Sequence, residues 1–175
     1  MNVQVGSPAP EFTVPAMIGD SVDPEEISLS EYRGKWVVLF FYPLDFTFVC
    51  PTEVTGFEKE YDRFRELNAE VIGASVDSIY AHMAWREQKG GIGTLRFPLA
   101  SDITKSLSRS YGALLEDQGI ALRATYIIDP DGVLRYQVVQ DFGVGRSVKE
   151  TLRVLEALQT FKNCPVDWQP GEATL

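Results

Sequence analysis

The sequence predicts an α/β fold in which helices flank a central mixed sheet behind an N-terminal extension. Apolar stretches of strand length alternate with amphipathic stretches of helical length, and short polar joints separate them. No internal repeat or low-complexity segment interrupts this alternation. At 175 residues with 45% hydrophobic residues, the chain has the size and composition of one domain that buries a core. We therefore expect a single globular domain.

The first third of the chain predicts a lead-in, a strand and a helix. Residues 1–32 are rich in Pro, Ser and acidic side chains, which indicates an irregular or hairpin segment that precedes the core. Residues 35–41 are continuously apolar, as is typical of a central strand that is covered on both faces. Residues 51–67 have the spacing of a helix that buries one face. Its apolar positions are Val54, Phe57, Tyr61 and Phe64.

The middle of the chain continues the alternation. Residues 70–76 predict a second buried strand. Residues 78–89 predict a helix that Asp77 and Ser78 cap, because short polar side chains satisfy the free N–H groups of a first turn. Residues 103–111 then predict a short helix.

The last third predicts a hairpin and a helix. Residues 124–128 and 133–139 are strand-like and flank the turn signal Asp-Pro-Asp-Gly, so we expect an antiparallel pair. Ser147 caps a helix that runs to about residue 161. Its apolar face consists of Val148, Leu152, Leu155 and Leu158. This order of elements is that of a thioredoxin-like fold, although the absence of Cys-x-x-Cys argues against a thioredoxin or a disulfide isomerase.

Composition argues against several classes of partner. The formal net charge of −9 and the lack of any basic run argue against nucleic-acid binding, which needs clustered Lys and Arg. The longest apolar runs are far shorter than the roughly 20 residues of a membrane span. The N-terminus has no basic-then-apolar signal segment. We therefore expect a cytoplasmic protein that binds neither nucleic acid nor membranes.

The two cysteines, Cys50 and Cys164, are the residues most informative about function. In a cytoplasmic chain, two distant cysteines suit a transient redox pair better than a structural disulfide, although two unrelated buried thiols would give the same count. Cys50 lies between the predicted strand and the predicted helix. There, free backbone N–H groups and the helix dipole stabilise a thiolate, which is the nucleophile of thiol chemistry.

Pro43, Thr47 and Cys50 form a Pro-x-x-x-Thr-x-x-Cys pattern. Taken alone, Pro43 or Thr47 would also fit a capped, proline-bounded loop. The full pattern resembles the active-site signature of the peroxiredoxins, and the resemblance extends over nearly the whole chain. It is strongest to the typical two-cysteine subgroup, which includes the bacterial alkyl hydroperoxide reductase C component. It implies a thioredoxin-like peroxiredoxin domain at residues 1–161 and a C-terminal tail at residues 162–175 that carries the resolving cysteine.

The resemblance implies peroxide reduction, with Cys50 attacking the O–O bond. Thr47 would hydrogen-bond the sulfur and the incoming peroxide, and Pro43 would shield the thiolate from water and from a second oxidation. Arg123 lies in residues 122–129, which resemble the family's arginine-bearing strand, so its guanidinium would stabilise both thiolate and peroxide. By its position alone, Arg123 would fit a surface charge pair at a strand end.

Glu53 and Arg146 resemble the residues that orient this arginine in the family. Glu53 lies one helical turn after Cys50. Arg146 lies in the segment Gly-Val-Gly-Arg-Ser, directly before the last predicted helix.

Cys164 begins the segment Cys-Pro-Val-Asp-Trp-Gln-Pro-Gly, which resembles the resolving-cysteine segment of typical two-cysteine members, with Asn163 in place of the usual Val. The resemblance implies that Cys50 becomes a sulfenic acid and then forms a disulfide with Cys164 of the partner subunit. It also implies a homodimer, often assembled into a decamer, and re-reduction by thioredoxin or a dedicated flavoprotein reductase. We interpret Trp168 as a packing anchor. A tail thiol without a partner is the alternative for Cys164.

Other groups of residues give weaker indications of a catalytic, metal or cofactor site. His82, the only histidine, lacks the orienting group and oxyanion hole that a hydrolase pair with Cys50 needs, so we interpret it as structural. Two distant cysteines and one histidine lack the close ligand pairs of a zinc site. No Gly-rich phosphate loop follows a strand. We therefore expect neither a metal nor a cofactor.

Three functions remain open from the sequence. A thiol peroxidase for hydrogen peroxide and organic hydroperoxides is the function that uses Pro43, Thr47, Cys50, Arg123 and Cys164 together. A redox relay or sensor would use the same cysteines to oxidise a client protein, and rapid turnover with a general reductase would argue against it. A holdase chaperone would protect an unfolding client even after Cys50→Ser substitution.

Overall fold

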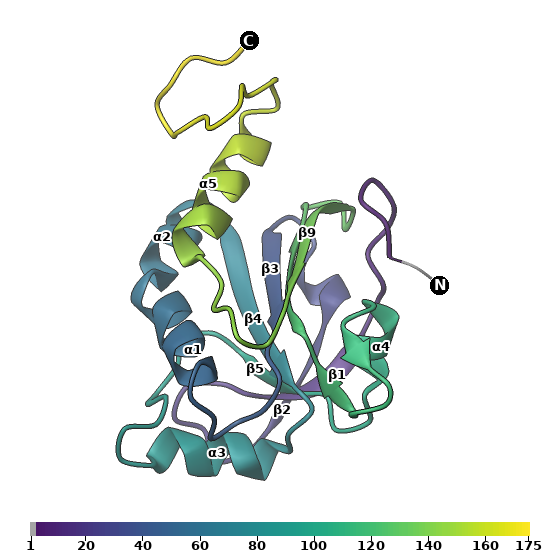
Figure 1. The fold of residues 1–175 in the computed structure, drawn as a ribbon, viewed down its shortest axis with the longest axis vertical. Helices are drawn as coiled ribbons and strands as arrows, with labels where there is room; N and C mark the ends of the chain where they lie inside the picture. Colours follow the sequence, from purple (N-terminus) through teal and green to yellow (C-terminus); the bar gives the residue numbers. More distant parts are fainter. Residues whose placement is uncertain (1–2) are drawn as a thin grey trace.

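The fold is described here from a computed structural model of residues 3–175. Within these residues, one mixed sheet contains the strands β1 (Thr13–Met17), β2 (Glu25–Ser28), β3 (Trp36–Phe41), β4 (Ala69–Ser75), β5 (Leu99–Ser101), β8 (Arg123–Ile128) and β9 (Leu134–Gln140). Their order across the sheet is β2-β1-β5-β4-β3-β8-β9, and helices cover both faces (Figure 1). The predicted α/β fold with a central mixed sheet is therefore confirmed.

β3 is the central strand predicted from residues 35–41, and its side chains alternate between two cores. One set consists of Val37, Leu39 and Phe41, and the other consists of Trp36, Val38 and Phe40. β3 pairs in parallel with β4 and antiparallel with β8. A strand that is buried on both faces needs apolar residues at every position, which explains its continuous apolar sequence.

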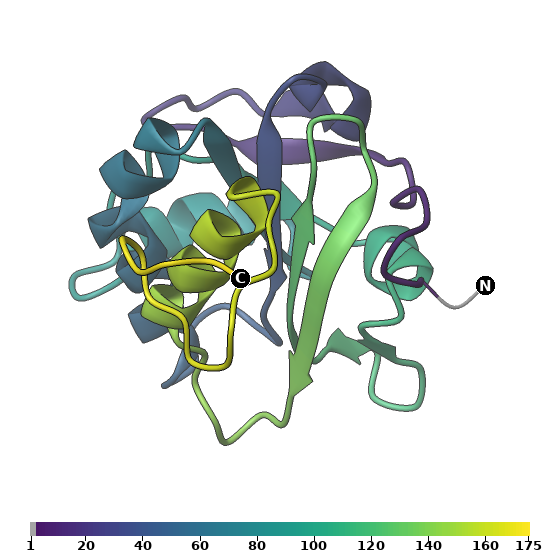
Figure 2. The same ribbon diagram turned by 90° about the horizontal axis from the view of Figure 1, so that it is seen from above.

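The two cores lie on opposite faces of the sheet. One core is covered by α1 (Cys50–Lys59), α2 (Tyr61–Glu66), α3 (Ile79–Glu87) and α5 (Val148–Gln159). The other is covered by α4 (Ser106–Ser110), the short 3-10 helix Leu29–Tyr32 and the N-terminal segment. Figure 2 shows the sheet between these two layers.

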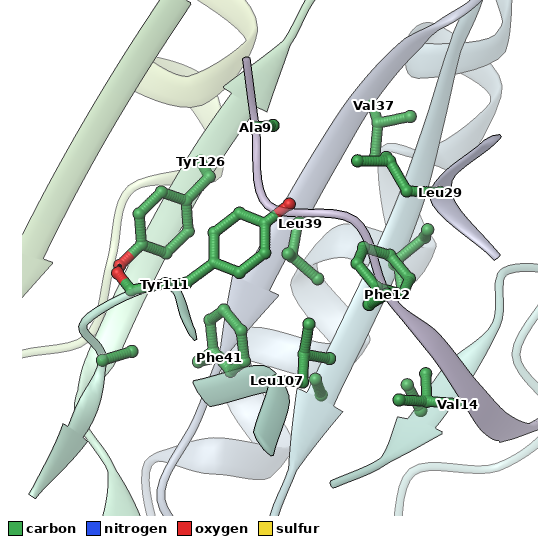
Figure 3. Packing of buried hydrophobic residues seen from close by; sticks show 14 of the residues in the cluster. Ala9, Phe12, Val14, Leu29, Val37, Leu39, Phe41, Leu107, Tyr111 and Tyr126 are labelled. Carbon is green, nitrogen blue, oxygen red and sulfur yellow. Dashed lines mark hydrogen bonds between the residues drawn. The ribbon is translucent and has the colours of Figure 1, made fainter. Parts of the chain in front are cut away.

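The N-terminal lead-in belongs to the core and does not merely precede it. β1 and β2 form the hairpin that was one of the two predicted alternatives, and β1 also pairs antiparallel with β5. Phe12 packs against Tyr111, whose ring lies 5.0 Å from that of Tyr126 (Figure 3). The polar composition of the segment hid this burial because only alternate residues face inward. Residues 1 and 2 of the predicted lead-in lie outside the described residues.

The helix predicted over residues 51–67 is two helices. It begins at Cys50 and breaks at Glu60, whose φ of −96° and ψ of 7° end α1 before α2 begins. Phe57 of α1 and Phe64 of α2 still face the same core, with ring centroids 5.8 Å apart. The spacing of apolar residues predicts only which face of a helix is buried. Because α1 and α2 bury the same face, this spacing continues across Glu60 and could not predict the break.

Two predicted helix starts need correction. Ser78 caps α3 by accepting a hydrogen bond from the Ala81 N–H, whereas the Asp77 carboxylate accepts from the Asp45 N–H instead. α4 is shorter than the predicted residues 103–111, because Lys105 has a left-handed φ of 60°. The Asp102 carboxylate, from before this turn, accepts from two N–H groups in the first turn of α4.

The C-terminal third follows the prediction closely. β8 and β9 form the expected antiparallel hairpin, and Asp129 closes its turn by accepting from the N–H groups of Asp131 and Val133. Ser147 caps α5 through the Glu150 N–H. β5 and the small pair β6 (Leu114–Leu115) and β7 (Ile120–Ala121) were not predicted, because two or three residues are too few for a periodic pattern. Across residues 3–175, no helix combines the length and hydrophobicity that a membrane crossing requires.

Candidate active site

Cys50 is the first residue of α1 and is fully buried, with 0% of its surface exposed. The loop that follows β3 places Cys50 beyond the carboxyl end of that strand, and Pro51 occupies the first turn of the helix. Proline fits there because the first turn has no use for its missing N–H. The sulfur therefore lies at the positive end of the helix dipole and away from water.

Arg123, the first residue of β8, contacts the Cys50 sulfur. Its Nη1 donates to Cys50 Sγ at 3.3 Å and to Glu53 Oε2 at 2.6 Å, and its Nε donates to the Phe142 carbonyl at 2.8 Å. Only 4% of Arg123 is exposed. Burial alone would lower the pKa of Arg123, but the hydrogen bond to Cys50 and the charge of Glu53 raise it above its ordinary value. The guanidinium therefore stays charged beside the sulfur.

Glu53 joins this arginine to a second one. Its Oε1 accepts from the backbone N–H of Arg146 at 2.9 Å and from Arg146 Nε at 3.0 Å. Arg146 also donates to the carbonyls of Phe41 and Ala124, so it ties α1 to two strands of the sheet. Burial lowers the pKa of Arg146, which the charge of Glu53 opposes. Two guanidiniums facing one carboxylate leave one positive charge to balance a Cys50 thiolate.

Pro43 and Thr47 lie in the loop between β3 and α1. Pro43 is buried and Thr47 is half-buried. The Thr47 hydroxyl donates to the Leu44 carbonyl at 3.0 Å, so the structure gives it a partner other than the Cys50 sulfur. With its proton committed to this carbonyl, the oxygen keeps its lone pairs free to accept a hydrogen bond.

A buried polar network, which the sequence did not reveal, holds this loop. Asp45 accepts from the Tyr42 hydroxyl at 2.7 Å and contacts His82 Nδ1 at 2.6 Å, while His82 Nε2 lies 3.1 Å from the Ala100 carbonyl. His82 is thus structural, as predicted. Burial and the charge of Asp45 together raise the pKa of Asp77, which accepts from the Asp45 N–H. The available signals were an aspartate inside the cysteine motif and a lone histidine on an amphipathic helix. In residues 3–175, no three His, Cys, Asp or Glu side chains gather as they would around a metal ion.

Cys164 lies in the tail beyond α5, far from Cys50 of the same chain. Its sulfur is 3.5 Å from Thr160 Oγ1 and 3.8 Å from the Ala157 carbonyl, both at the C-terminal end of α5. The N-terminal end of α5, Val148, lies two residues after Arg146. About 18 Å of helix therefore separates Cys164 from the Arg146 end of the site. Both thiols are free. The structure thus brings Cys50, Arg123, Glu53 and Arg146 together and leaves Cys164 apart.

Comparisons with known proteins show which family the chain resembles. The model of the AhpC/TSA family matches residues 5–137. The chain is 51% identical over 181 residues to Peroxiredoxin-2 of Rattus norvegicus, covering 99% of this chain and 90% of that protein. It is similar to the reduced 2-Cys peroxiredoxin of Plasmodium vivax, with 43% identity, a TM-score of 0.93 and coverage of 97% and 91% of the two chains. AhpC of Mycobacterium tuberculosis gives 41% identity, a TM-score of 0.86 and coverage of 97% and 100%.

Proposed function

Because this chain belongs to the AhpC/TSA family and is a typical 2-Cys peroxiredoxin, a thiol-dependent peroxidase with a thioredoxin-like fold, we propose that it reduces hydrogen peroxide and organic hydroperoxides through Cys50 and Cys164. The observation that carries this proposal is the 3.3 Å contact between Arg123 Nη1 and the buried Cys50 sulfur. It places a permanent cation beside a cysteine at a helix N-terminus, which favours the thiolate.

In the first step, the Cys50 thiolate attacks one peroxide oxygen and the O–O bond breaks. The departing oxygen takes the electron pair of the O–O bond and a proton from the solvent and leaves as water or an alcohol, while the sulfur keeps the other O–H and becomes a sulfenic acid. Arg123 is placed to stabilise the charge that develops on the departing oxygen. The free lone pairs of Thr47 Oγ1 are suited to accept the peroxide O–H.

In the second step, the Cys164 thiol attacks the sulfenic acid, a disulfide forms and water leaves. We propose that this disulfide joins two subunits, because the length of α5 keeps the two thiols of one chain apart. The proposed assembly is a homodimer that associates further into a decamer. A dithiol protein, either thioredoxin or a dedicated flavoprotein reductase, would then restore both thiols. The predicted cytoplasmic location stays a prediction that cell fractionation checks.

The experiment that tests this function starts from fully reduced protein. One equivalent of hydrogen peroxide is added, free thiols are blocked within seconds, and the products are analysed on a non-reducing gel and by intact mass. We expect a species of twice the chain mass, joined through Cys50 and Cys164, which disappears in a Cys164→Ser control. An oxidised monomer would contradict the disulfide between subunits. Two free thiols after treatment would contradict the peroxidase mechanism itself.

A further inference from the structure

The loop between β3 and α1 carries Thr47 and runs beside α3 (Figure 1). In the middle of this loop, Asp45 is held at three of its atoms. Its carboxylate accepts from the Tyr42 hydroxyl and contacts His82 Nδ1, and its backbone N–H donates to Asp77 Oδ2 at 2.9 Å. Asp45 is only 6% exposed. These bonds therefore fix both the side chain and the backbone of Asp45.

The peptide that joins Leu44 to Asp45 connects Asp77 with Thr47. It is trans and planar, so its N–H and its C=O point in opposite directions. The N–H donates to the Asp77 carboxylate, and the C=O accepts from the Thr47 hydroxyl at 3.0 Å. Because the peptide is rigid, the direction that Asp77 imposes on the N–H also decides where the carbonyl points. Asp77 thus sets the direction of the Thr47 hydroxyl proton through one peptide.

Phe46 turns the chain back so that Thr47 reaches this carbonyl. The Phe46 φ of 58° lies in the left-handed region, which is uncommon for a bulky residue and persists where the surroundings hold it. The Phe46 ring packs against Trp85 of α3, with centroids 6.0 Å apart. The turn is therefore held on one side by the hydrogen bonds of Asp45 and on the other by the ring of Phe46.

Asp77 is itself anchored to the ends of two strands. Ser75, the last residue of β4, donates from Oγ to Asp77 Oδ2 at 2.7 Å and accepts from the Asp77 N–H at 3.2 Å. Ser101, the last residue of β5, donates to the main-chain carbonyl of Asp77 at 2.6 Å. The carboxylate that binds the Asp45 N–H therefore has a fixed place relative to the sheet.

We propose that Asp77 is a positioning residue for peroxide binding: through the Leu44–Asp45 peptide it directs the Thr47 proton and thereby leaves the oxygen lone pairs free for the peroxide O–H. This inference rests on the proposed function, in which Thr47 Oγ1 accepts that hydrogen bond. Without the Asp77 carboxylate the peptide is less restrained, so the Thr47 proton spends part of its time in other directions. Peroxide is then held less often in the orientation that Cys50 attacks.

The test measures the oxidation of Cys50 in variants that all carry Cys164→Ser, so that Cys50 is the only thiol. Reduced protein is mixed with hydrogen peroxide in a quenched-flow instrument, free thiol is blocked, and intact mass gives the rate constant. Asp77→Ala removes the acceptor and should lower this rate constant by about fivefold, because a misdirected hydrogen bond keeps only part of its strength. Asp77→Asn keeps an oxygen that accepts from the Asp45 N–H and should retain most of the rate.

Ser101→Ala is the matched control. It removes a buried hydrogen bond to the same residue, but at the main-chain carbonyl of Asp77, so the carboxylate still binds the Asp45 N–H. We expect the parent rate of peroxide reaction in this variant. Alkylation of Cys50 by iodoacetamide is a second control, because this reagent has no O–H for Thr47 to accept. Asp77→Ala should leave the alkylation rate unchanged.

A double-mutant cycle separates positioning from a merely structural role. Asp77→Ala should cause no further loss of peroxide rate in Thr47→Val, because the oxygen that Asp77 orients is then absent. An equal loss in both backgrounds, an equal slowing of alkylation, or an unchanged peroxide rate in Asp77→Ala would each overturn the proposal. If Cys50 of the parent protein does not react with peroxide, it is the proposed function that fails.

Amide exchange in the wild type tests the anchoring of the peptide without any substitution, so it decides even where Asp77→Ala fails to fold. The Asp45 N–H, bound to the Asp77 carboxylate in a residue that is 6% exposed, should exchange more slowly than exposed amides. Exchange at the rate of a free peptide would overturn the proposal whatever the kinetics.

Discussion

Glu53 Oε2 lies 2.6 Å from Arg123 Nη1, and the same nitrogen lies 3.3 Å from Cys50 Sγ. One carboxylate, which is itself only 4% exposed, therefore orients the cation that faces the sulfur. Its other oxygen binds Arg146, so one buried carboxylate holds two guanidiniums in place. A substitution of Glu53 should therefore lower both the rate of peroxide reduction and the free energy of unfolding.

Glu53→Gln should lower kcat/KM for peroxide by about 10–100-fold, by analogy with the partners that orient metal ligands, whose loss typically costs that much. It should also lower the free energy of unfolding by about 3–5 kcal/mol, since two buried guanidiniums would lose their counter-charge. Stopped-flow kinetics and urea titration measure the two effects. Glu58→Gln is the control, because Glu58 lies on the same helix but binds Arg96 at the surface. Wild-type kinetics in Glu53→Gln would contradict the orienting role.

Thr47→Val should lower kcat/KM for hydrogen peroxide by about tenfold or more, because a lost hydrogen bond to substrate corresponds to about 1.4 kcal/mol or more. The reason is that the Thr47 oxygen, whose proton goes to the Leu44 carbonyl, would no longer be present to accept from the peroxide. Thr47→Ser keeps the hydroxyl and should retain most of the activity. Wild-type activity in Thr47→Val together with a loss in Thr47→Ser would show that packing of the Thr47 methyl, not its oxygen, is what matters.

Asp77→Asn should change the pH dependence of stability. Burial and the charge of Asp45 raise the folded-state pKa of Asp77 above its ordinary value of 3.8. Folding therefore favours the protonated form, so the wild type loses stability, relative to the Asn variant, as the pH rises from below 3.8 through the raised pKa. Urea unfolding of both proteins between about pH 3 and pH 7 measures this difference. A difference that does not vary with pH would contradict the raised pKa.

Gly73→Ala should destabilise the fold by about 1–3 kcal/mol through overpacking of the core. A Cβ at Gly73, in the middle of β4, would lie 2.7 Å from Phe40 Cζ and 2.8 Å from Leu99 Cδ1. Thermal or urea unfolding measures the loss. Gly143→Ala is the control, because a Cβ there meets nothing within 4 Å. Equal stability of the two variants would mean that the core around Phe40 yields easily.

The local features of this protein could be predicted from its sequence. The apolar run at residues 35–41 and the Asp-Pro-Asp-Gly turn each act within a few residues, so their patterns indicated a strand and a hairpin that the structure contains. The position of Cys50 between strand and helix was predicted in the same way. Where a strand has only three residues, as at Leu99–Ser101, its sequence is too short to show a periodic pattern, and no prediction was possible.

The sequence by itself determined the α/β alternation and the place of Cys50 at a helix start. Only the tertiary structure decided that Arg123 donates to its sulfur, that Glu53 binds two arginines, and that the Thr47 proton goes to the Leu44 carbonyl. By its position alone, without the family resemblance, Arg123 favoured a surface charge pair. The physical reason is that strand, turn and cap signals arise from neighbours in the chain. A buried charge pair between distant residues exists only where the packed sheet excludes water and aligns both partners.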